Sequence, residues 1–421
     1  MRRGMYSIAT VFGVLGLTIF GVTAAFGRAG SSRASTRVHA AWSLSCPDPY
    51  PATRDPSNPL MLPTPPGSNP LTGAHFFVDG PAHGVAAGAI ARLMGLNPKA
   101  FPDNYSWAQF KAEIAAGQYH ARFAGLPAPT RFKILMLEKI ADQPEAQRFS
   151  AYVYGNGNPD SVTKQVEKIF CHNMTADPGS IPIITTYFLH PDVGKVCKDP
   201  AKINANAPRF RSQIDAMAAA TGNRPAVYLL EIDAIGTSTC GRGLSTYLSL
   251  LHYEVQKISA LPHVVVYIEG GYADSHDPTY TAKALNQAGV QSVRGFYTND
   301  THLDWTINEV HWAEKVSKMT GGAHFIVNTS DNGNGPKKNP HPVKQGIEDL
   351  CNPPNRAIGP LPTTQTGFPL ADAWMWEHVP GESSGRCHGG PPSGTFWPNR
   401  AIQMAAKGSY RLGPRYPAQR T

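Results

Sequence analysis

Residues 224–236 read RPAVYLLEIDAIG, and this stretch decides the fold. Its middle, residues 226–232, is a nearly unbroken apolar run, which is typical of a strand buried on both faces. Strands of this kind belong to parallel sheets, in which a helix carries the chain from one strand to the next. Two carboxylates, Glu231 and Asp233, stand at the end of the run. Because functional side chains of parallel α/β barrels lie at such strand ends, the same stretch points to a site.

The chain around this stretch alternates strands and helices. Strands are predicted at residues 181–189, 226–232, 264–268, 292–297 and 324–328, and helices at 208–221, 243–260, 280–288 and 306–319. Repeated β-α units predict one parallel α/β domain. No glycine-rich phosphate loop follows any of these strands, which argues against a dinucleotide-binding sheet. We therefore expect a single distorted, incomplete parallel β/α barrel (TIM-like), followed up to about residue 397 by long loops rich in glycine and proline.

Polar side chains stand at or just after the ends of the predicted strands. They are Tyr187, Asp192, Glu231, Asp233, Glu269, Asn299 and Asn328. Strand ends of a parallel barrel meet at one mouth, so these side chains are expected to face a common cleft. A cluster of carboxylates, without a phosphate loop or a set of histidines spaced as metal ligands, favours acid–base hydrolysis of a glycoside, with no cofactor and no metal. The alternative, that each is an ordinary loop carboxylate, stays open from spacing alone.

Several ordered segments resemble glycoside hydrolase family 6, the inverting cellulases. Residues 224–236 resemble the strand that carries the family's Glu-Pro-Asp signature, and residues 69–79 (NPLTGAHFFVD) resemble its opening "NPF-x-VD" strand. Residues 322–335, 351–359 and 372–385 are similar to the segments "HFIIDTSRNGNG", "CNPPGRGLG" and "DAYLWVKPPGESDG". The resemblance extends from about Asn69 to Lys407. It implies a glucanase-like hydrolase that acts on β-1,4-glucan or a related polysaccharide.

The resemblance also implies a role for each matching residue. Asp233 matches the general acid, Tyr187 matches a tyrosine beside it, and Asp192 would be the counterpart of an aspartate that tunes the acid. Glu269 stands where the family has an active-site aspartate. The remaining positions that the resemblance assigns to catalysis or substrate binding are Asn299, Asn328, Trp376, His378, Glu382 and Ser384.

The departures from the family are concentrated at the site. Ser384 replaces the aspartate of "GESD", the favoured base, and a hydroxyl cannot take up a proton as a carboxylate does. The family's "YLDAGHAGW" reads YIEGGYADS at residues 267–275, so its stacking tryptophan is missing, and Leu350 stands where a second tryptophan is expected. His378 replaces a lysine. Other replacements are Asp331 for an arginine and Asn328 for an aspartate. The residues left as a replacement base are Glu269, Glu382 and Asp274, with activation of water through a chain as the other alternative, and the sequence does not choose among them.

Six cysteines, an even number, favour disulfides and an oxidising compartment: Cys46, Cys171, Cys197, Cys240, Cys351 and Cys387. None forms a C-x-x-C pair, which argues against a zinc site. The resemblance implies the pairs Cys197–Cys240 and Cys351–Cys387, each tying a loop at the site, and leaves Cys46 with Cys171.

The N-terminus predicts export. Arg2 and Arg3 precede a mostly apolar stretch at residues 5–27, which is typical of a signal peptide or of a single membrane anchor. We expect residues 1–40 to be that signal peptide or anchor, 41–68 a linker rich in proline and serine, 69–410 the catalytic domain and 411–421 a basic tail. The protein would be secreted, or held on the outer face of the membrane by residues 5–27.

The charge does not point to nucleic acid. The net charge is +8, but the lysines and arginines are scattered and not interleaved with aromatic residues. The expected partner is a polysaccharide substrate, with membrane contact only through the N-terminal segment, and the expected state is a monomer.

Two functions fit these observations. The first is a glycoside hydrolase with Asp233 as its acid, and retention of Glu231 and Glu382 favours it. The second is a non-catalytic glycan-binding or cell-wall protein on a degenerate family 6 fold, which the serine at position 384 favours.

Overall fold

The computed structural model describes residues 58–65, 67–150, 159–192, 196–236, 240–336 and 350–414. All of them belong to one compact unit, Cys46–Thr421. The expected signal peptide or anchor, most of the linker and most of the basic tail lie outside the described residues and stay predictions. Within the described ranges, no helix is long and apolar enough to cross a membrane.

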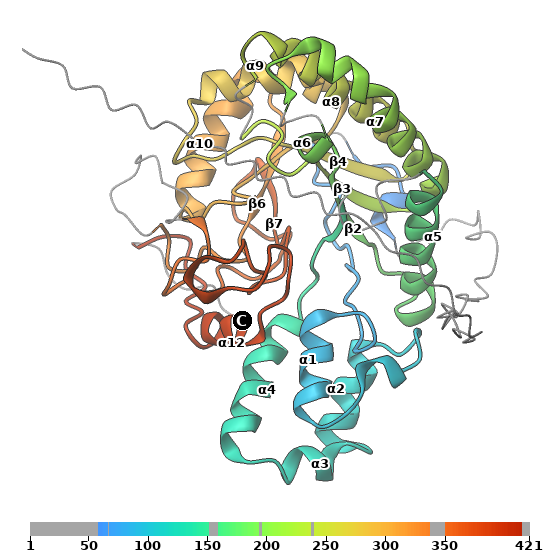
Figure 1. Ribbon diagram of the computed structural model, residues 1–421, viewed down its shortest axis with the longest axis vertical. Helices are drawn as coiled ribbons and strands as arrows, with labels where there is room; N and C mark the ends of the chain where they lie inside the picture. Colours follow the sequence, from blue (N-terminus) through green and yellow to red (C-terminus); the bar gives the residue numbers. More distant parts are fainter. Residues whose placement is uncertain are drawn as a thin grey trace, which may run out of the picture. The chain divides into compact units, whose positions relative to one another are not determined.

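One sheet of parallel strands forms the centre of the described chain, and its strands follow one another in chain order (Figure 1). They are β1 (Gln147–Ser150), β2 (Ile183–Tyr187), β3 (Ala226–Leu230), β4 (Val264–Glu269), β5 (Gly295–Thr298), β6 (His324–Asn328) and β7 (Ala371–Met375). Among the described residues, no ladder pairs β1 with β7. A backbone hydrogen bond of 2.9 Å, from Ala146 N to Trp376 O, joins the two edges. The expected incomplete α/β barrel is confirmed.

Helices cover the outer face of the sheet, and Figure 1 shows them following one another around it. They are α5 (Pro159–Ala176), the short α6 (Leu189–Asp192), α7 (Pro200–Thr221), α8 (Leu244–Ser259), α9 (Pro278–Ala288) and α10 (Thr306–Met319). On β3, Tyr228 and Leu230 pack against these helices, while Val227 and Leu229 pack in the barrel interior. Because side chains alternate along a strand, one apolar run supplies both cores, as the unbroken run at residues 226–230 requires.

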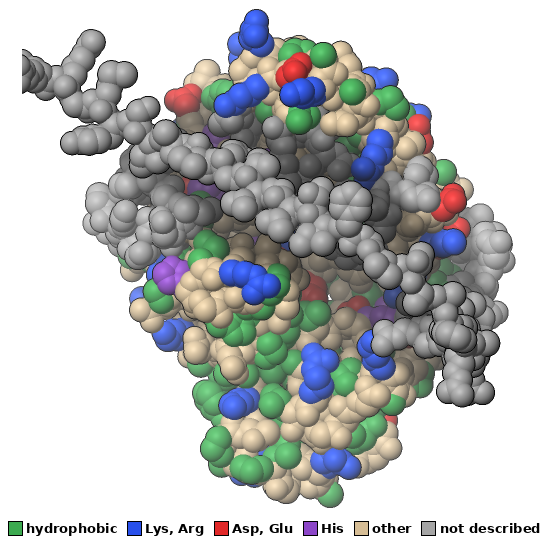
Figure 2. All heavy atoms as spheres, in the orientation of Figure 1, with side chains coloured by type: hydrophobic (Ala, Val, Ile, Leu, Met, Phe, Trp, Pro, Cys, Tyr) green, Lys and Arg blue, Asp and Glu red, His purple; other side chains and the backbone are tan. Residues whose placement is uncertain are grey.

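A separate helical core lies beside the barrel. It is formed by α1 (Val85–Leu93), α2 (Trp107–Ala116), α4 (Ala128–Ala141) and α12 (Pro398–Ala406), with the short α3 (His120–Ala124) next to α2. Short 3-10 helices complete the described elements: η1 (Pro59–Met61), η2 (Pro98–Ala100), η5 (Gly241–Gly243), η6 (Val290–Ser292) and η7 (Cys387–Gly389). On the face shown in Figure 2, lysines and arginines of the described residues are scattered among hydrophobic side chains.

The predicted elements match the structure best where the sequence has clear end signals. Residues 306–319 and 324–328 match α10 and β6 residue by residue. Helix α7 differs, because it begins at Pro200 and not at Pro208. Asp199 caps it by accepting the amide of Ala201 at 3.0 Å, and Pro200 fills the first turn, where a missing N–H costs little. Pro208 therefore lies inside the helix.

Two segments pack where loops or a linker were expected. Strand β7 lies in the region rich in glycine and proline, and all five of its residues are buried. Leu60 and Met61 of η1 are also buried, 7% and 5% exposed, so packing onto the barrel begins before Asn69. Their neighbour Asn58 caps η1 by accepting the amide of Leu60 at 3.0 Å.

Asp372 joins the N-terminal ends of four strands. Its carboxylate is 1% exposed and accepts two hydrogen bonds from Arg294, at 2.7 and 2.9 Å. The hydroxyl of Tyr267 donates to it at 2.7 Å, and His324 Nδ1 lies 3.0 Å away. This network links β4, β5, β6 and β7 at the end of the barrel where these strands begin, opposite the C-terminal strand ends.

We predict that Asp372→Ala lowers the free energy of unfolding by about 3–5 kcal/mol, because it leaves the Arg294 guanidinium half-buried without its partner. Urea denaturation measures this change. Asp215, which pairs with Lys257 at 2.8 Å on the surface, is the matched control. Asp215→Ala should unfold at nearly the same urea concentration as the parent, and an equal loss in both variants would contradict the assignment.

Candidate active site

Asp233 follows β3 in a turn whose backbone is unusual. The φ angles of Glu231 and Asp233 are +58° and +62°, and that of Asn299, just after β5, is +66°. Residues other than glycine adopt this left-handed conformation at a cost of roughly 1–2 kcal/mol each. Strained backbone persists where the surroundings hold it, and it is concentrated at functional sites. The ends of β3 and β5 are therefore the first candidates for the site.

The Asp233 side chain ties three strand ends together. The hydroxyl of Tyr272, in the loop after β4, donates to Asp233 Oδ1 at 2.6 Å. Thr301 Oγ1, in the loop after β5, lies 3.0 Å from the same oxygen. The backbone N–H of Asp233 donates to Asp300 Oδ2 at 3.0 Å. These contacts hold the Asp233 carboxyl in place. Asp233 is also partly exposed, so its carboxyl is accessible to a substrate.

Asp300 is a site residue that the sequence reasoning missed. Its carboxyl is fully buried and accepts the amides of Asp233 and Thr301. Burial raises the pKa of Asp300 well above its usual range, and the negative charges of Glu269 and Asp233 raise it further. A buried carboxyl with a raised pKa therefore lies directly behind the Asp233 backbone. Its place next to Asn299, at a predicted strand end, was the available signal.

Glu231 and Glu269 are buried supports of the same mouth, each 0% exposed. Glu231 accepts the backbone amides of Phe188 at 3.0 Å and Leu189 at 2.7 Å. Glu269 accepts the amides of Ile235 at 2.5 Å and Gly236 at 2.9 Å, and also that of Gly271. Burial raises the pKa of Glu269 to about 8 in spite of these donors. Both carboxyls hold loops, and neither faces solvent.

A second charged group lies where β1 and β7 approach each other. Arg148 of β1 donates to Glu382 Oε1 at 2.5 Å, and its other nitrogen lies 3.7 Å from Glu377 Oε1. Burial alone would raise the pKa of Glu377, but the charges of Arg148 and His378 more than offset it and the pKa is lowered. The Glu377 side chain is 1% exposed and that of Glu382 is 19% exposed. Glu382 is thus a carboxylate at the cleft surface with a cation beside it.

His378 completes this group. Its Nδ1 lies 3.1 Å from Glu377 Oε2, and its Nε2 lies 3.0 Å from Ser330 Oγ and 3.6 Å from Asp331 Oδ2. Burial lowers the pKa of His378, but hydrogen bonds and charges from Asp331 and Glu377 outweigh burial and raise it to about 10. The imidazole is therefore positively charged at neutral pH.

The side chains of Asn299 and Asn328, which are expected to contact substrate, form hydrogen bonds within the protein instead. Asn328 Nδ2 donates to the carbonyls of Asn299 and Asp300, and its Oδ1 accepts the amide of Glu377 at 3.1 Å. Asn299 Nδ2 in turn donates to Asn328 O at 3.0 Å. These two side chains connect the ends of β5, β6 and β7.

Trp376, also expected to contact substrate, is 0% exposed and packs in the core of α1, α2, α4 and α12. It therefore has no exposed ring face on which a sugar could stack. Ser384, in contrast, is exposed, and its backbone N–H donates to Asn352 Oδ1 at 3.0 Å.

The remaining predicted residues lie near these two groups. Tyr187, at the end of β2, stacks on His190 with ring centroids 5.9 Å apart. Burial raises the pKa of the Tyr187 hydroxyl, and the charge of Asp233 adds to the effect, so the two side chains are neighbours. Asp274 is 3% exposed, and its Oδ1 lies 2.7 Å from His302 Nδ1. Asp192 ends α6, and its side chain lies outside the described part of the structure.

Two of the expected disulfides are confirmed. Cys197 bonds Cys240 and Cys351 bonds Cys387, which ties the loop after α6 to the loop after β3, and residue 351 to the loop that carries Ser384. The third pairing involves Cys46, which lies outside the described residues. Over the described ranges, no group of three or more His, Cys, Asp or Glu side chains is arranged to hold a metal ion.

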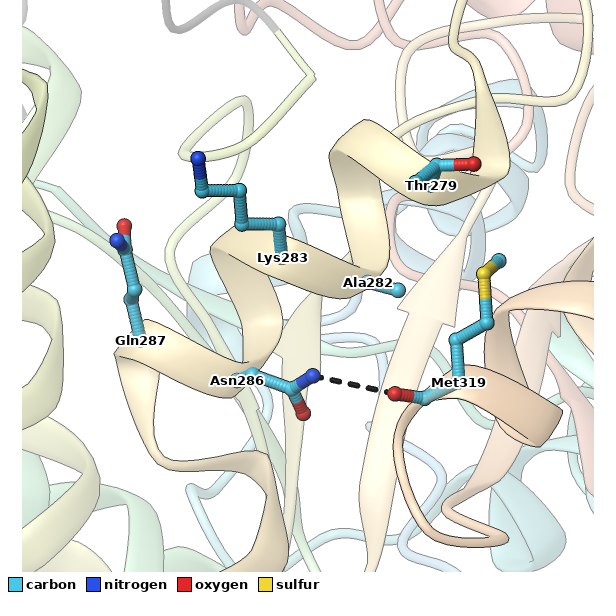
Figure 3. A pocket seen from close by; sticks show the side chains of 6 residues that line it. All are labelled: Thr279, Ala282, Lys283, Asn286, Gln287 and Met319. Atoms are coloured by element: carbon cyan, nitrogen blue, oxygen red, sulfur yellow. Dashed lines mark hydrogen bonds between the residues drawn. The ribbon is translucent and has the colours of Figure 1, made fainter.

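A surface pocket outside the barrel is not part of this site. Figure 3 shows its lining, which comes from α9 and the end of α10: Thr279, Ala282, Lys283, Asn286, Gln287 and Met319. None of these side chains surrounds Asp233, and the lining contains no carboxylate.

Comparison with known proteins gives one consistent family. Residues 132–408 match the family model described as glycosyl hydrolases family 6. The chain is 31% identical over 280 residues to Endoglucanase 1 of Streptomyces sp. (strain KSM-9), covering 64% of this chain and 71% of that protein. It is 28% identical over 270 residues to Endoglucanase A of Cellulomonas fimi, and this match spans only 56% of that relative's length.

Solved structures agree. The endoglucanase Cel6 from Mycobacterium tuberculosis, in complex with a methyl-cellobiosyl-thio-cellobioside, has a TM-score of 0.62 and 27% identity, covering 81% of this chain and 99% of that chain. The cellobiohydrolase Cel6A from Humicola insolens, in complex with glucose and cellotetraose, has a TM-score of 0.53 at 20% identity, which supports the fold alone.

We predict that the charge on His378 stabilises the folded protein in a pH-dependent way. Its pKa is about 10 in the folded protein against a usual value of 6.5. The stabilisation is therefore complete below pH 6.5 and is lost as the pH rises through 10. The difference in urea midpoint between the parent and His378→Gln should be largest near pH 6 and should shrink steadily towards pH 10 and above.

The control for this measurement is His120→Gln, on the exposed face of α3, which should leave the midpoint unchanged throughout. A difference for His378→Gln that stays constant or grows with pH would contradict the assigned charge.

Proposed function

Because this chain belongs to glycoside hydrolase family 6, we propose that it hydrolyses β-1,4-glucan or a related polysaccharide, with Asp233 as the general acid. The observation that carries the proposal is the position of Asp233. It is a partly exposed carboxyl at the mouth of the barrel, backed by the buried carboxyls of Asp300 and Glu269. A general acid needs a positioned carboxyl that can meet the leaving oxygen, and this one is fixed from three strands.

Glu382 is our proposed base. Of the three candidates, Glu269 is 0% and Asp274 is 3% exposed, whereas the Glu382 side chain is 19% exposed. Glu269 already accepts backbone amides, and Asp274 contacts His302. The guanidinium of Arg148 lies 2.5 Å from Glu382 Oε1 and holds this carboxylate at the cleft surface.

The reaction would then proceed by inversion. Asp233 gives its proton to the glycosidic oxygen as the bond to the anomeric carbon breaks. A water molecule attacks that carbon from the opposite face and gives its proton to Glu382. We assign Glu269 to holding the loops after β3 and β4, and the exposed hydroxyl of Ser384 to hydrogen bonding with water or sugar.

Export is part of the proposal. The apolar stretch at residues 5–27 favours it, and the disulfides Cys197–Cys240 and Cys351–Cys387 suit an oxidising compartment. A glucanase outside the cytoplasm also meets its polymeric substrate.

The second candidate function is glycan binding without catalysis. The observation in its favour is the close ion pair between Arg148 and Glu382, which engages the proposed base in the absence of substrate. Glycan retention without product release would support it.

We predict that the purified protein releases new reducing ends from a panel of β-glucans, and that Asp233→Asn lowers the rate about 10²- to 10⁴-fold, the usual contribution of a positioned acid. Proton NMR of the first products should show the α-anomer. Asp215→Asn, on the outer surface of α7, is the matched control and should keep the parent rate. Retention of a glucan with no release by either protein would favour the binding function.

We also predict that Glu382→Gln lowers turnover at least about 100-fold, and that sodium azide partly restores it by forming an α-glycosyl azide, because azide needs no base. Product analysis by mass spectrometry and NMR measures the rescue. Undiminished turnover of Glu382→Gln would remove Glu382 from the mechanism while leaving Asp233 in place.

A further inference from the structure

We propose that Tyr272 is a positioning residue for Asp233, and that it determines which carboxyl oxygen delivers the proton. This inference rests on the proposed function and adds a component to it that the family resemblance did not assign. Tyr272 stands where the family's "YLDAGHAGW" segment has a histidine.

The contact with Asp233 is short and directional. Tyr272 donates its hydroxyl hydrogen to Asp233 Oδ1 at 2.6 Å. Thr301 Oγ1 lies 3.0 Å from that oxygen and 2.9 Å from the Tyr272 oxygen, so its hydrogen can reinforce either group. In a protonated carboxyl, the oxygen that accepts such bonds is the carbonyl oxygen. Oδ2 is then the oxygen that carries the proton, and Asp233 cannot turn about its last bond without losing the Tyr272 contact.

The Tyr272 ring is itself held in place by stacking on a histidine. It is 1% exposed and stacks on His302, with ring centroids 3.7 Å apart and planes inclined by 10°. His302 Nδ1 lies 2.7 Å from Asp274 Oδ1, which fixes the imidazole. Asp274 and Tyr272 belong to the loop after β4, and His302 belongs to the loop after β5. The two loops together therefore form the support.

Gly236 gives an independent sign of the same fit. A Cβ atom at position 236 would lie 2.4–2.6 Å from the Tyr272 ring and hydroxyl. The turn after β3 therefore needs a glycine at position 236, where the Tyr272 side chain passes close to the backbone. The backbone N–H of Gly236 donates to Glu269 at 2.9 Å, and this bond would remain in an alanine variant.

Other titratable groups also face Asp233, and a test must separate Tyr272 from them. They are Tyr187, Tyr247, Glu269 and Asp300, each close enough for its charge or that of Asp233 to act on the other. The Tyr272→Phe substitution leaves these groups in place, because it removes only the hydroxyl oxygen and keeps the ring that stacks on His302.

The test compares two leaving groups. Cleavage of cellotetraose needs a proton from the acid, whereas a dinitrophenyl cellobioside loses its leaving group without one. We expect Tyr272→Phe to lower kcat on cellotetraose about 10- to 100-fold, the value of one hydrogen bond to a charged group, with little change in KM. On the dinitrophenyl substrate, kcat should stay within about twofold, as no proton is needed. A general loss of structure would lower both.

Two further measurements complete the test. The alkaline limb of the pH profile on cellotetraose, and the midpoint of the Asp233 carboxyl signal in a carbon-13 NMR titration, should both move up by about one to two pH units, because the lost donor favoured the ionised form. Gly236→Ala should change the activities in the same way by displacing the hydroxyl. Tyr253→Phe, which removes a surface hydroxyl 2.7 Å from Asp215, is the control and should change nothing.

The outcomes are distinct. If the parent is active and Tyr272→Phe changes neither the two rates nor the NMR midpoint, the inference is overturned and the proposed function stands. Equal losses on both substrates also overturn it. A parent that cleaves neither substrate overturns the proposed function, and the NMR midpoint then decides whether the Tyr272 contact governs the carboxyl.

Discussion

Four carboxyl groups meet at the ends of β3, β4 and β5, and their mutual repulsion is the constraint around which this end of the protein is built. Glu231 and Glu269 are stabilised by backbone amides from the loops that they hold. Asp300 is buried behind Asp233, and burial raises its pKa well above the usual range. Asp233 remains as the partly exposed member. The local fold thus leaves one carboxyl partly exposed and buries the other three.

At the opposite edge of the barrel mouth, the carboxylates have cationic side chains as neighbours. There the carboxylates Glu377 and Glu382 lie beside Arg148, and the charges of Arg148 and His378 lower the pKa of Glu377. Arg148 also connects β1 to the segment after β7, which are the two edges of the incomplete barrel. The pKa values of Asp300 and Glu269 are therefore raised at one edge of the cleft, while that of Glu377 is lowered at the other. Environments that differ in this way are what an acid and a base require.

The sequence predicted most of the barrel because buried parallel strands are unbroken apolar runs, and β6 and α10 are bounded by clear signals. It missed β7, whose five residues are flanked by glycine- and proline-rich loops, and it placed the start of α7 at the wrong proline. For the site, motif matching gives candidate positions such as Asp233 and Glu382, but a motif carries no side-chain direction: Trp376, expected in the cleft, is buried in a core. Asp300 and Arg148 act through neighbours that are 67 and 234 residues away in sequence, and no local pattern carries such contacts.

The departures from the family bear on whether the site has decayed. Random loss at a buried site leaves charges without partners, which is costly. Here the replacements contact one another or new partners. His378 stands in place of a lysine and Asp331 in place of an arginine, and the two side chains lie 3.6 Å apart. One cation and one anion thus replace two cations. Tyr272, in place of a histidine, fits between Asp233 and His302, with Gly236 making room for it. Matched contacts of this kind keep the buried charges of the site paired, as a stable fold requires.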